Sequence, residues 1–543
     1  MANMKQTVLL LPAEQLLREF LLECALHFPG LEIWIAGGWV RDRLLGIPSS
    51  DLDLALSNVT GREFGKYLES FSAEPDIESK YCQKVAGLGI AGSRFTKFHI
   101  MEKNVGMSKN LETAGGKLFG LDIDLVNLRK EVYDGQSRTP HMEFGTPEED
   151  AFRRDATVNS LFFHLEKQEI VDLTGRGLKD LNARIMATPL DPHQTFMDDP
   201  LRVLRFIRIG SKLGFSIEPE AMRCVKDREI RRALDTIITR DRIGIELFKM
   251  MTDPDPAVAF QLIFELNLYS PVFLRLDSPL LQTLQTDFLF LEPLTSPKWP
   301  ITWPRAYQLL TALLKDRNNL GTLVQSETNL SHLWIMAAYA PIAGLRQTML
   351  RQAVLEATAA IRAPAKVSKL LESALKNFDS IHTTVNSIVA ETGKSPLRSL
   401  IGMAIRSWGA TWIGQVTYVM LAQVVYANEM PSTSVSSTNS SLIDESTAGT
   451  ILGRYSAFAD FVCENDLRDA HLQRPLLNGN LIQSLFGLQR GGNFLKTAID
   501  ELMAWQFDHT NSSVEEAEAW LLSQQERIGI PMNNETWELE STL

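Results

Sequence analysis

A pair of glycines at a predicted strand–helix corner, followed closely by two aspartates, restricts the fold of this chain more than any other feature. Residues 31–35 are typical of a strand that leads into residues 37–42, Gly-Gly-Trp-Val-Arg-Asp, and residues 40–45 are typical of the first turns of a helix. Glycines at such a corner let the backbone approach a bulky anion while the amides of the helix N-terminus point toward it. Asp51 and Asp53 project from one face of a second predicted strand. Two carboxylates beside a phosphate-sized gap suit divalent metal ions and a nucleoside triphosphate, which favours phosphoryl or nucleotidyl transfer.

The charge distribution is compatible with a polyanionic partner. The 543 residues are enough for three or more domains, and the net charge of −12 by itself argues against nucleic acid. Residues 151–250, however, contain 18 Lys and Arg against 15 Asp and Glu. A basic middle in an acidic chain can grip a polyanion locally, although chance variation on a solvated surface explains the same numbers equally well.

Cysteine usage and hydropathy point to a reducing compartment. The four cysteines lie far apart, without metal-ligand spacing or a disulfide framework. No apolar run is long enough to span a bilayer. Residues 1–14 contain one lysine and no arginine, so they do not predict a signal or transit peptide.

The first 190 residues mix strand and helix patterns, whereas the chain from about 194 onward is helical almost throughout. Residues 83–117 and 130–147 lack clear periodicity and are predicted to be irregular. The Ser/Thr-rich residues 428–450 are predicted to form a disordered surface loop. The predicted strands are 31–36, 51–56, 121–128 and 159–165, and an amphipathic helix is predicted at 493–507.

Two further groups of charged residues have chemistry suited to a nucleotide. Arg153, Arg154 and Asp155 precede a predicted strand; arginine forks bind phosphate oxygens, and an aspartate can accept a hydrogen bond from a ribose hydroxyl. By itself, such a run is more often a salt-bridged surface patch. Asp124, two residues after Asp122 on a predicted strand, is either a third carboxylate near the first aspartate pair or a surface residue at a strand entrance.

An arginine stripe follows an aspartate pair in residues 198–208. Pro200 suits an early helix position after an aspartate cap. Apolar residues fill the rest of the circumference, as in a largely buried helix. The arginines either extend to solvent along their aliphatic stems or line an internal groove beside a nucleotide. They recur at every third residue, as Arg202, Arg205 and Arg208.

In this order and at these intervals, the motifs resemble those of the class II tRNA nucleotidyltransferases, the CCA-adding enzymes, and of their eukaryotic and fungal members in particular. These enzymes belong to the superfamily that also contains poly(A) polymerases. The resemblance is nearly continuous from about residue 31 to 250 and faint beyond 300; one departure is Asp198, where many relatives have a glutamate. The residues that resemble the family's motifs are 37–42 with Asp51 and Asp53, 109–114, 117–120, 144–150, 153–159, 175–181, 198–208 and 477–479.

The resemblance implies an α+β fold: a nucleotidyltransferase head with a small mixed β-sheet, followed by an all-helical neck, body and tail. It places the catalytic head in residues 1–190, a neck with the nucleotide-selecting motif in 191–270, and a tRNA-binding body and tail in 271–543. It also implies template-independent addition of CCA to the 3′ end of tRNA from CTP and ATP, with Mg²⁺ as the cofactor.

Residue roles follow from the resemblance position by position. Asp51 and Asp53 are implied to hold two Mg²⁺ ions; Asp124 is the candidate third catalytic carboxylate from its strand spacing alone. Arg154 and Asp155 are implied to contact the ribose. Nucleotide-binding residues are implied at Gly37, Gly38, Arg41, Arg153, Arg154, Asp155, Asn159, Asp199, Arg202, Arg205 and Arg208.

Asp199 and Arg202 match the family's base-reading pair. An aspartate carboxylate only accepts hydrogen bonds, and an arginine only donates them. Cytosine and adenine each offer an amino donor next to a ring-nitrogen acceptor, whereas uracil and guanine present the reverse. Such a pair therefore admits C and A and rejects U and G, with each good bidentate contact contributing about 1–3 kcal/mol of discrimination.

The family's change from C to A addition uses a flexible loop in the head, and residues 130–147 fall where this loop lies. Enzymes that add only CC commonly lack the loop, so its presence favours A addition. We expect that deleting residues 133–141 reduces A addition far more than C addition.

Other functions stay open from the sequence. The nearest are an enzyme that adds only CC or only A, and a poly(A) polymerase; a tRNA-binding scaffold with an inactive transferase domain is the non-enzymatic alternative. A metal-dependent phosphohydrolase is disfavoured because no His-Asp pair has ligand-like spacing. Cytoplasm and nucleus rank above the mitochondrion as the compartment, and the sequence does not indicate an oligomeric state.

Overall fold

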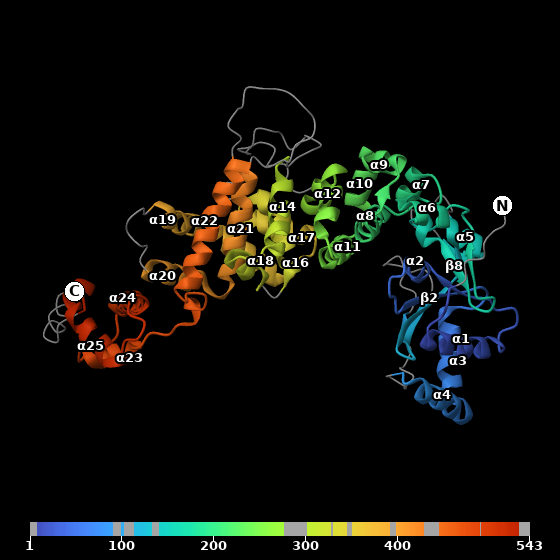
Figure 1. Ribbon diagram of the computed structural model, residues 1–543, viewed down its shortest axis with the longest axis horizontal. Helices are drawn as coiled ribbons and strands as arrows, with labels where there is room; N and C mark the ends of the chain where they lie inside the picture. The colour runs from blue at the N-terminus through green and yellow to red at the C-terminus, as the bar shows by residue number, and fades with distance from the viewer. Residues whose placement is uncertain are drawn as a thin grey trace, which may run out of the picture. The chain divides into compact units, whose positions relative to one another are not determined.

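The chain forms two compact units, which are described separately (Figure 1). The first contains residues Met1–Ile238 and the second Thr239–Leu543. The limits at 190 and 270 that the resemblance implies stay predictions. Within the described ranges, no helix is both long and apolar enough to cross a membrane. The computed structural model describes residues 8–90, 99–101, 113–132, 141–275, 301–326, 329–344, 350–390, 398–427, 445–488 and 490–530.

A mixed β-sheet forms the centre of the first unit. Its strands are β1 (Ile33–Ala36), β2 (Asp51–Leu56), β3 (His99–Met101), β4 (Thr113–Leu118), β5 (Leu121–Asn127), β8 (Leu161–His164) and β9 (Glu169–Asp172). They lie in the order β3-β4-β5-β2-β1-β8-β9. β2 and β5 run parallel, and the other neighbouring pairs run antiparallel. The mixed sheet implied by the resemblance is therefore confirmed.

The four predicted strands correspond to β1, β2, β5 and β8. The prediction of irregular structure was wrong for β3 and β4, and for the hairpin of β6 (Arg129–Val132) and β7 (His141–Phe144), which pair only with each other. β4 contains two adjacent glycines, and the hairpin strands are mostly polar, so hydrophobic alternation does not mark them. Residues 133–140, the middle of the predicted loop, lie outside the described residues.

Helices pack against this sheet and continue beyond it in the chain. The helix predicted from residue 40 is α2, which begins two residues earlier, at Gly38. Helix α8 begins two residues after Pro200, so this proline precedes the helix instead of lying in its first turn. The helices of the first unit are α1 (Pro12–Ala25), α2 (Gly38–Leu44), α3 (Gly61–Ser72), α4 (Pro75–Leu88), α5 (Pro147–Phe152), α6 (Gly177–Ala183), α7 (Pro192–Asp198), α8 (Arg202–Leu213), α9 (Pro219–Val225) and α10 (Arg228–Ile237). A 3₁₀ turn, η2 (Thr157–Asn159), and the short strands β10 (Ile185–Met186) and β11 (Ser216–Ile217) complete the unit.

Helix α3 covers the face of the sheet opposite to the aspartates of β2. A Cβ atom added at Gly61 would lie 2.2 Å from the carbonyl oxygen of Leu125, and one at Gly65 would lie 2.9 Å from the Cβ of Ala114. Any side chain at these two positions would push the helix away from β4 and β5. The two glycines thus allow close packing on the apolar face and leave the carboxylate face of the sheet open to solvent.

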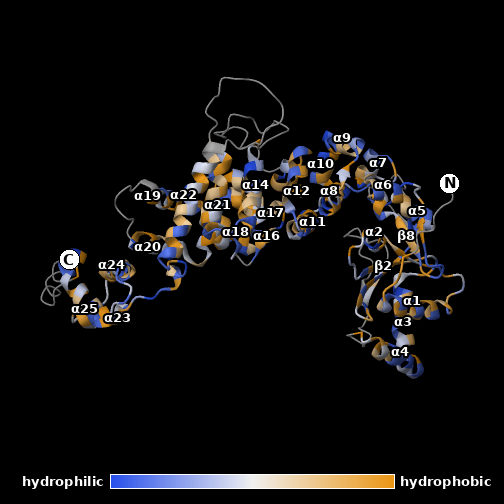
Figure 2. Cartoon of the chain, viewed as in Figure 1, coloured by the Kyte–Doolittle hydropathy of each residue, from blue (hydrophilic) through white to orange (hydrophobic). Residues whose placement is uncertain are grey.

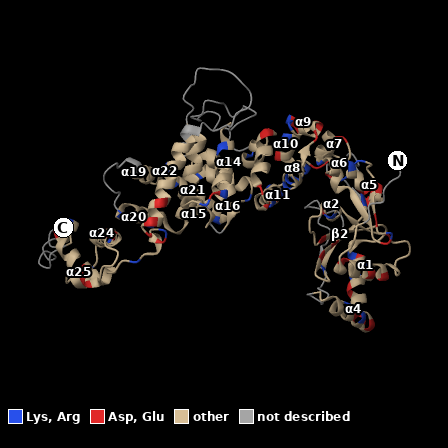
Figure 3. Ribbon diagram, viewed as in Figure 1, with Lys and Arg blue, Asp and Glu red and all other residues tan. Residues whose placement is uncertain are grey.

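The second unit is helical throughout the part of the chain that the structure describes. Helix α21 has no charged residue and is buried over most of its length; Figures 2 and 3 show it as largely hydrophobic and uncharged. Its helices are α11 (Arg240–Thr252), α12 (Pro256–Glu265), α14 (Trp303–Lys315), α15 (Asn319–Gln325), α16 (Leu330–Ala338), α17 (Leu350–Ala360), α18 (Ala365–Lys376), α19 (Phe378–Ala390), α20 (Arg398–Trp408), α21 (Trp412–Tyr426), α22 (Glu445–Glu464), α23 (Gly479–Leu485), α24 (Phe494–Asp508), α25 (Val514–Ser523) and α26 (Gln525–Ile528).

Two predictions in this unit can be compared with the structure. The amphipathic helix predicted at 493–507 is confirmed as α24, which packs with α23 and α25 around Leu502 and Leu521. The loop predicted at 428–450 is too long, because residues 445–450 form the first turns of α22. Residues 428–444 lie outside the described residues.

Candidate active site

Parallel pairing of β2 and β5 sets the predicted aspartates side by side. Asp53 is the register partner of Asp124, and Asp51 is the partner of Asp122. In both strands these aspartates are solvent-exposed and alternate with buried apolar residues. All four carboxylates therefore lie on the same open face of the sheet, and of the two readings for Asp124 the structure favours the one near Asp53.

The two aspartates of β5 have different surroundings. Asp122 forms an ion pair with Lys117 on β4, with 3.3 Å between Nζ and Oδ1. A Cβ atom added at Gly115, the register partner of Asp124, would lie 2.6 Å from Oδ1 of Asp124. The absent side chain at Gly115 therefore gives the Asp124 carboxylate its room, and the negative charge of Asp124 acts on Asp53.

Asp53 has the chemistry of a cation ligand. Its side chain reaches solvent, but surrounding atoms still remove enough water that partial burial raises its pKa; Arg154 opposes this effect, and Asp51 and Asp124 add to it. A bound divalent cation would relieve this excess of negative charge, so the donor set fits a metal ion that prefers oxygen ligands.

The carboxylates of the sheet are spread out rather than gathered around one point. Among the described residues, three potential metal ligands lie within 4.8 Å of one another at His193, Asp227 and Glu229, which are all exposed. That trio lies at α7 and α10, outside the arrangement described here. Aspartates two residues apart on one strand are suited to hold a pair of ions rather than a single one.

The corner between β1 and α2 lies beside Asp53. Ala36 pairs with Asp53 in the sheet, and Gly37 then has a φ of 75°, a left-handed conformation that favours glycine. A Cβ atom added at Gly37 would lie 2.9 Å from Nη1 of Arg154 and 3.9 Å from Oδ2 of Asp53. The absence of a side chain at position 37 therefore makes room for the Arg154 guanidinium next to Asp53.

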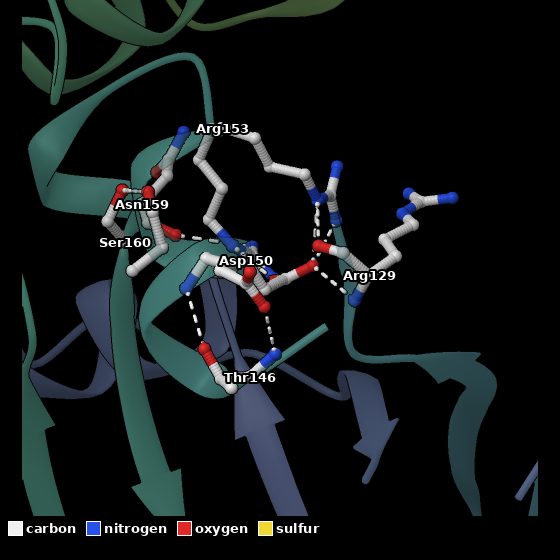
Figure 4. Close-up of polar contacts among 9 residues, drawn as sticks. Arg129, Thr146, Asp150, Arg153, Asn159 and Ser160 are labelled. Carbon is white, nitrogen blue, oxygen red and sulfur yellow. Dashed lines mark hydrogen bonds and ion pairs between the residues drawn. The ribbon is translucent and has the colours of Figure 1, made fainter. Parts of the chain in front are cut away.

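A fully buried carboxylate, Asp150, holds both arginines of the predicted phosphate-binding pair (Figure 4). Oδ1 accepts hydrogen bonds from Nε and Nη2 of Arg153, the first at 2.8 Å. Oδ2 accepts from Nε and Nη2 of Arg154 at 3.1 and 2.8 Å. Burial by itself would raise the pKa of Asp150, but the two guanidiniums outweigh it and the net pKa is lowered. The edge of each guanidinium formed by Nε and Nη2 is thus held by Asp150.

No role was predicted for Asp150, although two features of the sequence around it pointed to one. Asp150 precedes the arginines by three and four residues, the spacing of neighbours on a helix. It also lies on the six-residue helix α5, whose N-terminus is fixed by a capping box between Thr146 and Glu149 (Figure 4). The sequence does not show that the Asp150 side chain is buried, and an exposed carboxylate with this spacing would contribute little to stability.

A chain of hydrogen bonds joins α2 to α8 through η2. Nη1 of Arg41 donates to Oδ1 of Asn159 at 2.5 Å, Nδ2 of Asn159 donates to Oδ1 of Asp155 at 3.0 Å, and Nε of Arg205 donates to Oδ2 of Asp155 at 2.8 Å. Burial would raise the pKa of Asp155, but Arg205 and the hydrogen bond from Asn159 lower it well below its ordinary value. Both carboxylate oxygens of Asp155 are therefore engaged by protein groups.

The predicted base-reading pair lies at the start of α8. Oδ1 of Asp199 accepts from the amide of Leu201 at 3.2 Å, so the aspartate caps the chain just before the helix. Arg202 is 8% exposed, and its Nη1 donates to the carbonyl of Thr195 on α7 at 3.2 Å. Arg205 pairs with Asp155 although its side chain is 40% exposed, and Arg208, farther along α8, is also partly exposed. An internal groove beside a nucleotide therefore stays a prediction for the arginine stripe.

Comparisons with known proteins agree with this geometry. Residues 33–187 match the family described as the Poly A polymerase head domain. Three fungal relatives are similar over most of the chain. Nucleotidyltransferase lcsQ of Purpureocillium lilacinum is 34% identical over 92% of this chain and 88% of its own. The tRNA nucleotidyltransferase cca2 of Schizosaccharomyces pombe is 33% identical over 91% and 92%. The mitochondrial CCA tRNA nucleotidyltransferase of Saccharomyces cerevisiae is 31% identical over 90% and 87%.

The fold is also similar to that of solved structures. The Thermotoga maritima CCA-adding enzyme complexed with tRNA superposes with a TM-score of 0.60 at 16% identity, covering 96% of this chain and all of that one. A CCA-adding enzyme in its apo form gives the same TM-score at 17% identity, covering 94% and 95%. At this level of identity the likeness concerns the fold.

Proposed function

We propose a function on the premise that this chain belongs to the tRNA nucleotidyltransferase family, the CCA-adding enzymes. The protein is a nucleotidyltransferase that adds C, C and A to the 3′ end of tRNA, using CTP and ATP and releasing pyrophosphate. The observation that carries this conclusion is the position of Asp53 and Asp124, in register on parallel strands, beside Gly37 and Arg154. Carboxylates and fixed guanidiniums are parts that nucleotidyl transfer requires.

The residues of the sheet fit a divalent cofactor, which we propose is Mg²⁺ held by Asp51 and Asp53 with support from Asp124. When bound there, such ions would lower the pKa of the attacking tRNA 3′-hydroxyl and neutralise the triphosphate and the leaving pyrophosphate. The chain itself contributes the array of carboxylates, among them Asp53, whose pKa is raised first by burial and further by the charges of Asp51 and Asp124.

Residues around the glycine corner position the triphosphate. The backbone at Gly37 and Gly38 approaches the phosphates, and the N-terminal amides of α2 point at them. Arg154, with one edge fixed by Asp150, presents its guanidinium beside Gly37. Arg41 is oriented by Asn159. Because these groups are held before substrate arrives, binding needs little reorganisation.

Asp155 has a positioning role in this proposal, since its two oxygens bind Asn159 and Arg205. It connects the triphosphate side of the site, through Asn159 and Arg41, with the helix that starts at the base-reading pair. The ribose contact implied by the resemblance stays a prediction for Asp155.

Asp199 and Arg202 select the base by accepting from and donating to the same edge of the ring. Replacing Arg202 by alanine should relax discrimination against UTP and GTP by at least tenfold, about one bidentate contact. The measurement is kcat/KM for each of the four nucleotides with tRNA that lacks CCA. Full retention of the preference for CTP and ATP would show that Arg202 does not read the base.

The overall function is tested by incubating the full chain with tRNA lacking CCA and one labelled nucleotide at a time, with and without a chelator. We expect two C additions with CTP, one A addition to tRNA ending in CC, and loss of both when divalent ions are removed. Incorporation of C alone or A alone would identify a restricted enzyme, long A tails on any RNA a poly(A) polymerase, and binding without incorporation a scaffold.

The compartment is proposed from the name of the yeast relative, which places that protein in mitochondria. We propose that this chain serves mitochondria as well as cytoplasm and nucleus. Fractionation of cells expressing the tagged full chain, with tRNA end-sequencing of each fraction, tests the proposal; absence from mitochondria would limit it to the other two compartments.

A further inference from the structure

Helix α1 contributes a buried carboxylate to the short helix that borders the glycine corner. α1 lies before the residues that match the head-domain family. Its Glu14 is 2% exposed. Oε1 accepts a hydrogen bond from Nε1 of Trp39 at 3.1 Å, and both carboxylate oxygens accept from Nη2 of Arg43. Oε2 also accepts from the amide of Leu11 at 2.7 Å, so the carboxylate is fixed from its own side as well.

The two partners of Glu14 lie on one face of α2. Trp39 and Arg43 are four residues apart, which places them one above the other on a helix. The guanidinium of Arg43 also lies over the indole ring of Trp39, 5.4 Å from its centroid. The carboxylate of Glu14 therefore holds both Trp39 and Arg43 on this face of α2.

A different side of α2 is held by the site itself. Arg41 donates to Asn159 at 2.5 Å and to its neighbour Asp42 at 2.7 Å. Helix α2 has only seven residues, too few to be stable in isolation. Polar contacts on two sides, Asn159 on one and Glu14 on the other, therefore add to the buried packing of Trp39 and Val40 in setting the rotation of α2 about its own axis.

We propose that Glu14 is a positioning residue for triphosphate binding. It fixes the rotation of α2, and thereby the direction of the amide of Gly38 and of the Arg41 side chain, without touching the nucleotide. The proposal rests on the proposed function, in which the backbone at Gly38 and the side chain of Arg41 bind phosphates. Loss of the carboxylate leaves the Arg43 guanidinium and the Trp39 indole N–H without this acceptor. Helix α2 then rotates so that the two donors reach other acceptors or water.

The test compares Glu14→Gln with Glu19→Gln in the full chain. Glu19 lies on the same helix, is about 40% exposed and pairs with Lys84 at 2.7 Å, so it matches Glu14 in chemistry but not in burial. Kinetics are measured for CTP, ATP, UTP and GTP with tRNA lacking CCA, together with thermal melting and equilibrium binding of CTP without tRNA.

For Glu14→Gln we expect KM and the dissociation constant for CTP and ATP to rise about tenfold, as for the loss of one charged hydrogen bond. We expect kcat to stay within about twofold and KM for tRNA and the base preference to be unchanged. Glu19→Gln should behave as wild type. Glu14→Ala should show the same pattern more strongly, and if it does not fold, Glu14→Gln still decides.

Two results would overturn the proposal. One is an unchanged affinity for CTP in folded Glu14→Gln; the other is a variant that has a lower melting temperature and a smaller fraction of active protein but normal KM and dissociation constant for CTP. A wild-type chain that adds no nucleotide would instead contradict the proposed function. If Arg41→Ala left CTP affinity unchanged while Glu14→Gln lowered it, the assignment of Arg41 would fail, and the link from Glu14 through α2 to the phosphates would run through the backbone at Gly38 alone.

Discussion

Replacing Asp150 by asparagine tests how Arg153 and Arg154 are held. The side chain of Asp150 is 1% exposed, and those of Arg153 and Arg154 are 16% and 17% exposed. Asparagine keeps the shape and one acceptor oxygen, but its amide group then faces the donors of one arginine, which loses its acceptor.

The magnitude follows from this geometry. Removing one partner from a buried ion pair lowers the free energy of unfolding by about 3–5 kcal/mol. The remaining oxygen of asparagine still accepts hydrogen bonds from one guanidinium, so we expect a loss of about 3 kcal/mol. For a unit of the size of Met1–Ile238, each kcal/mol lowers the melting temperature by about 2–4 °C, which gives a shift of about 6–12 °C. Glu19→Gln, which removes an exposed ion pair, should cost less than about 1 kcal/mol.

The pH dependence of this loss has a definite sign. The pKa of Asp150 is lowered in the folded chain, so its carboxylate stabilises the fold fully above the unfolded pKa of about 3.9. The contribution disappears as the pH falls through the folded value. The difference in stability between wild type and Asp150→Asn should therefore be constant between about pH 5 and 7 and shrink below about pH 4.

The assay is thermal melting across this pH range, combined with KM for CTP at neutral pH. Because Arg154 lies beside Gly37 and acts on Asp53, we expect KM for CTP to rise along with the loss of stability. A shift in melting temperature below about 2 °C, or a deficit as large at pH 3 as at pH 7, would refute the buried double ion pair.

Two further substitutions test the carboxylate face and the corner. Gly37→Ala combines a φ of 75° with a Cβ 2.9 Å from Arg154 and should abolish nucleotide binding, whereas Gly46→Ala, with a φ of 70° and no neighbour within 4 Å, should cost only about 1–2 kcal/mol of stability. Equal CTP affinities in the two variants would show that the corner tolerates a side chain. Asp124→Asn should lower kcat and weaken the Mg²⁺ dependence of the reaction, whereas Asp122→Asn, which removes only the exposed pair with Lys117, should leave both near wild type; equal effects would show that Asp124 is a surface residue.

Much of the head could be predicted from the sequence because its elements follow local rules. The strands β1, β2, β5 and β8 have apolar runs or alternation, and the glycine corner needs a positive φ that the sequence supplies at Gly37. The hairpin of β6 and β7 was missed, since its strands are defined by backbone pairing with each other rather than by a side-chain pattern. The burial of α8 was predicted, but the partner of Arg205 was not.

The sequence by itself predicted which residues supply the chemistry: the aspartates of β2, the glycine corner, the paired arginines, and Asp199 with Arg202. Spacing along one strand or helix sets which side chains share a face, and this is a local property. Only the tertiary structure decided which strands and helices lie next to each other, and therefore which of these side chains meet. Parallel pairing of β2 with β5 placed Asp124 against Asp53, and burial turned Asp150 and Glu14 into the groups that orient the arginines and α2. These contacts join residues far apart in the chain, so their strength depends on packing that removes water, which no local pattern encodes.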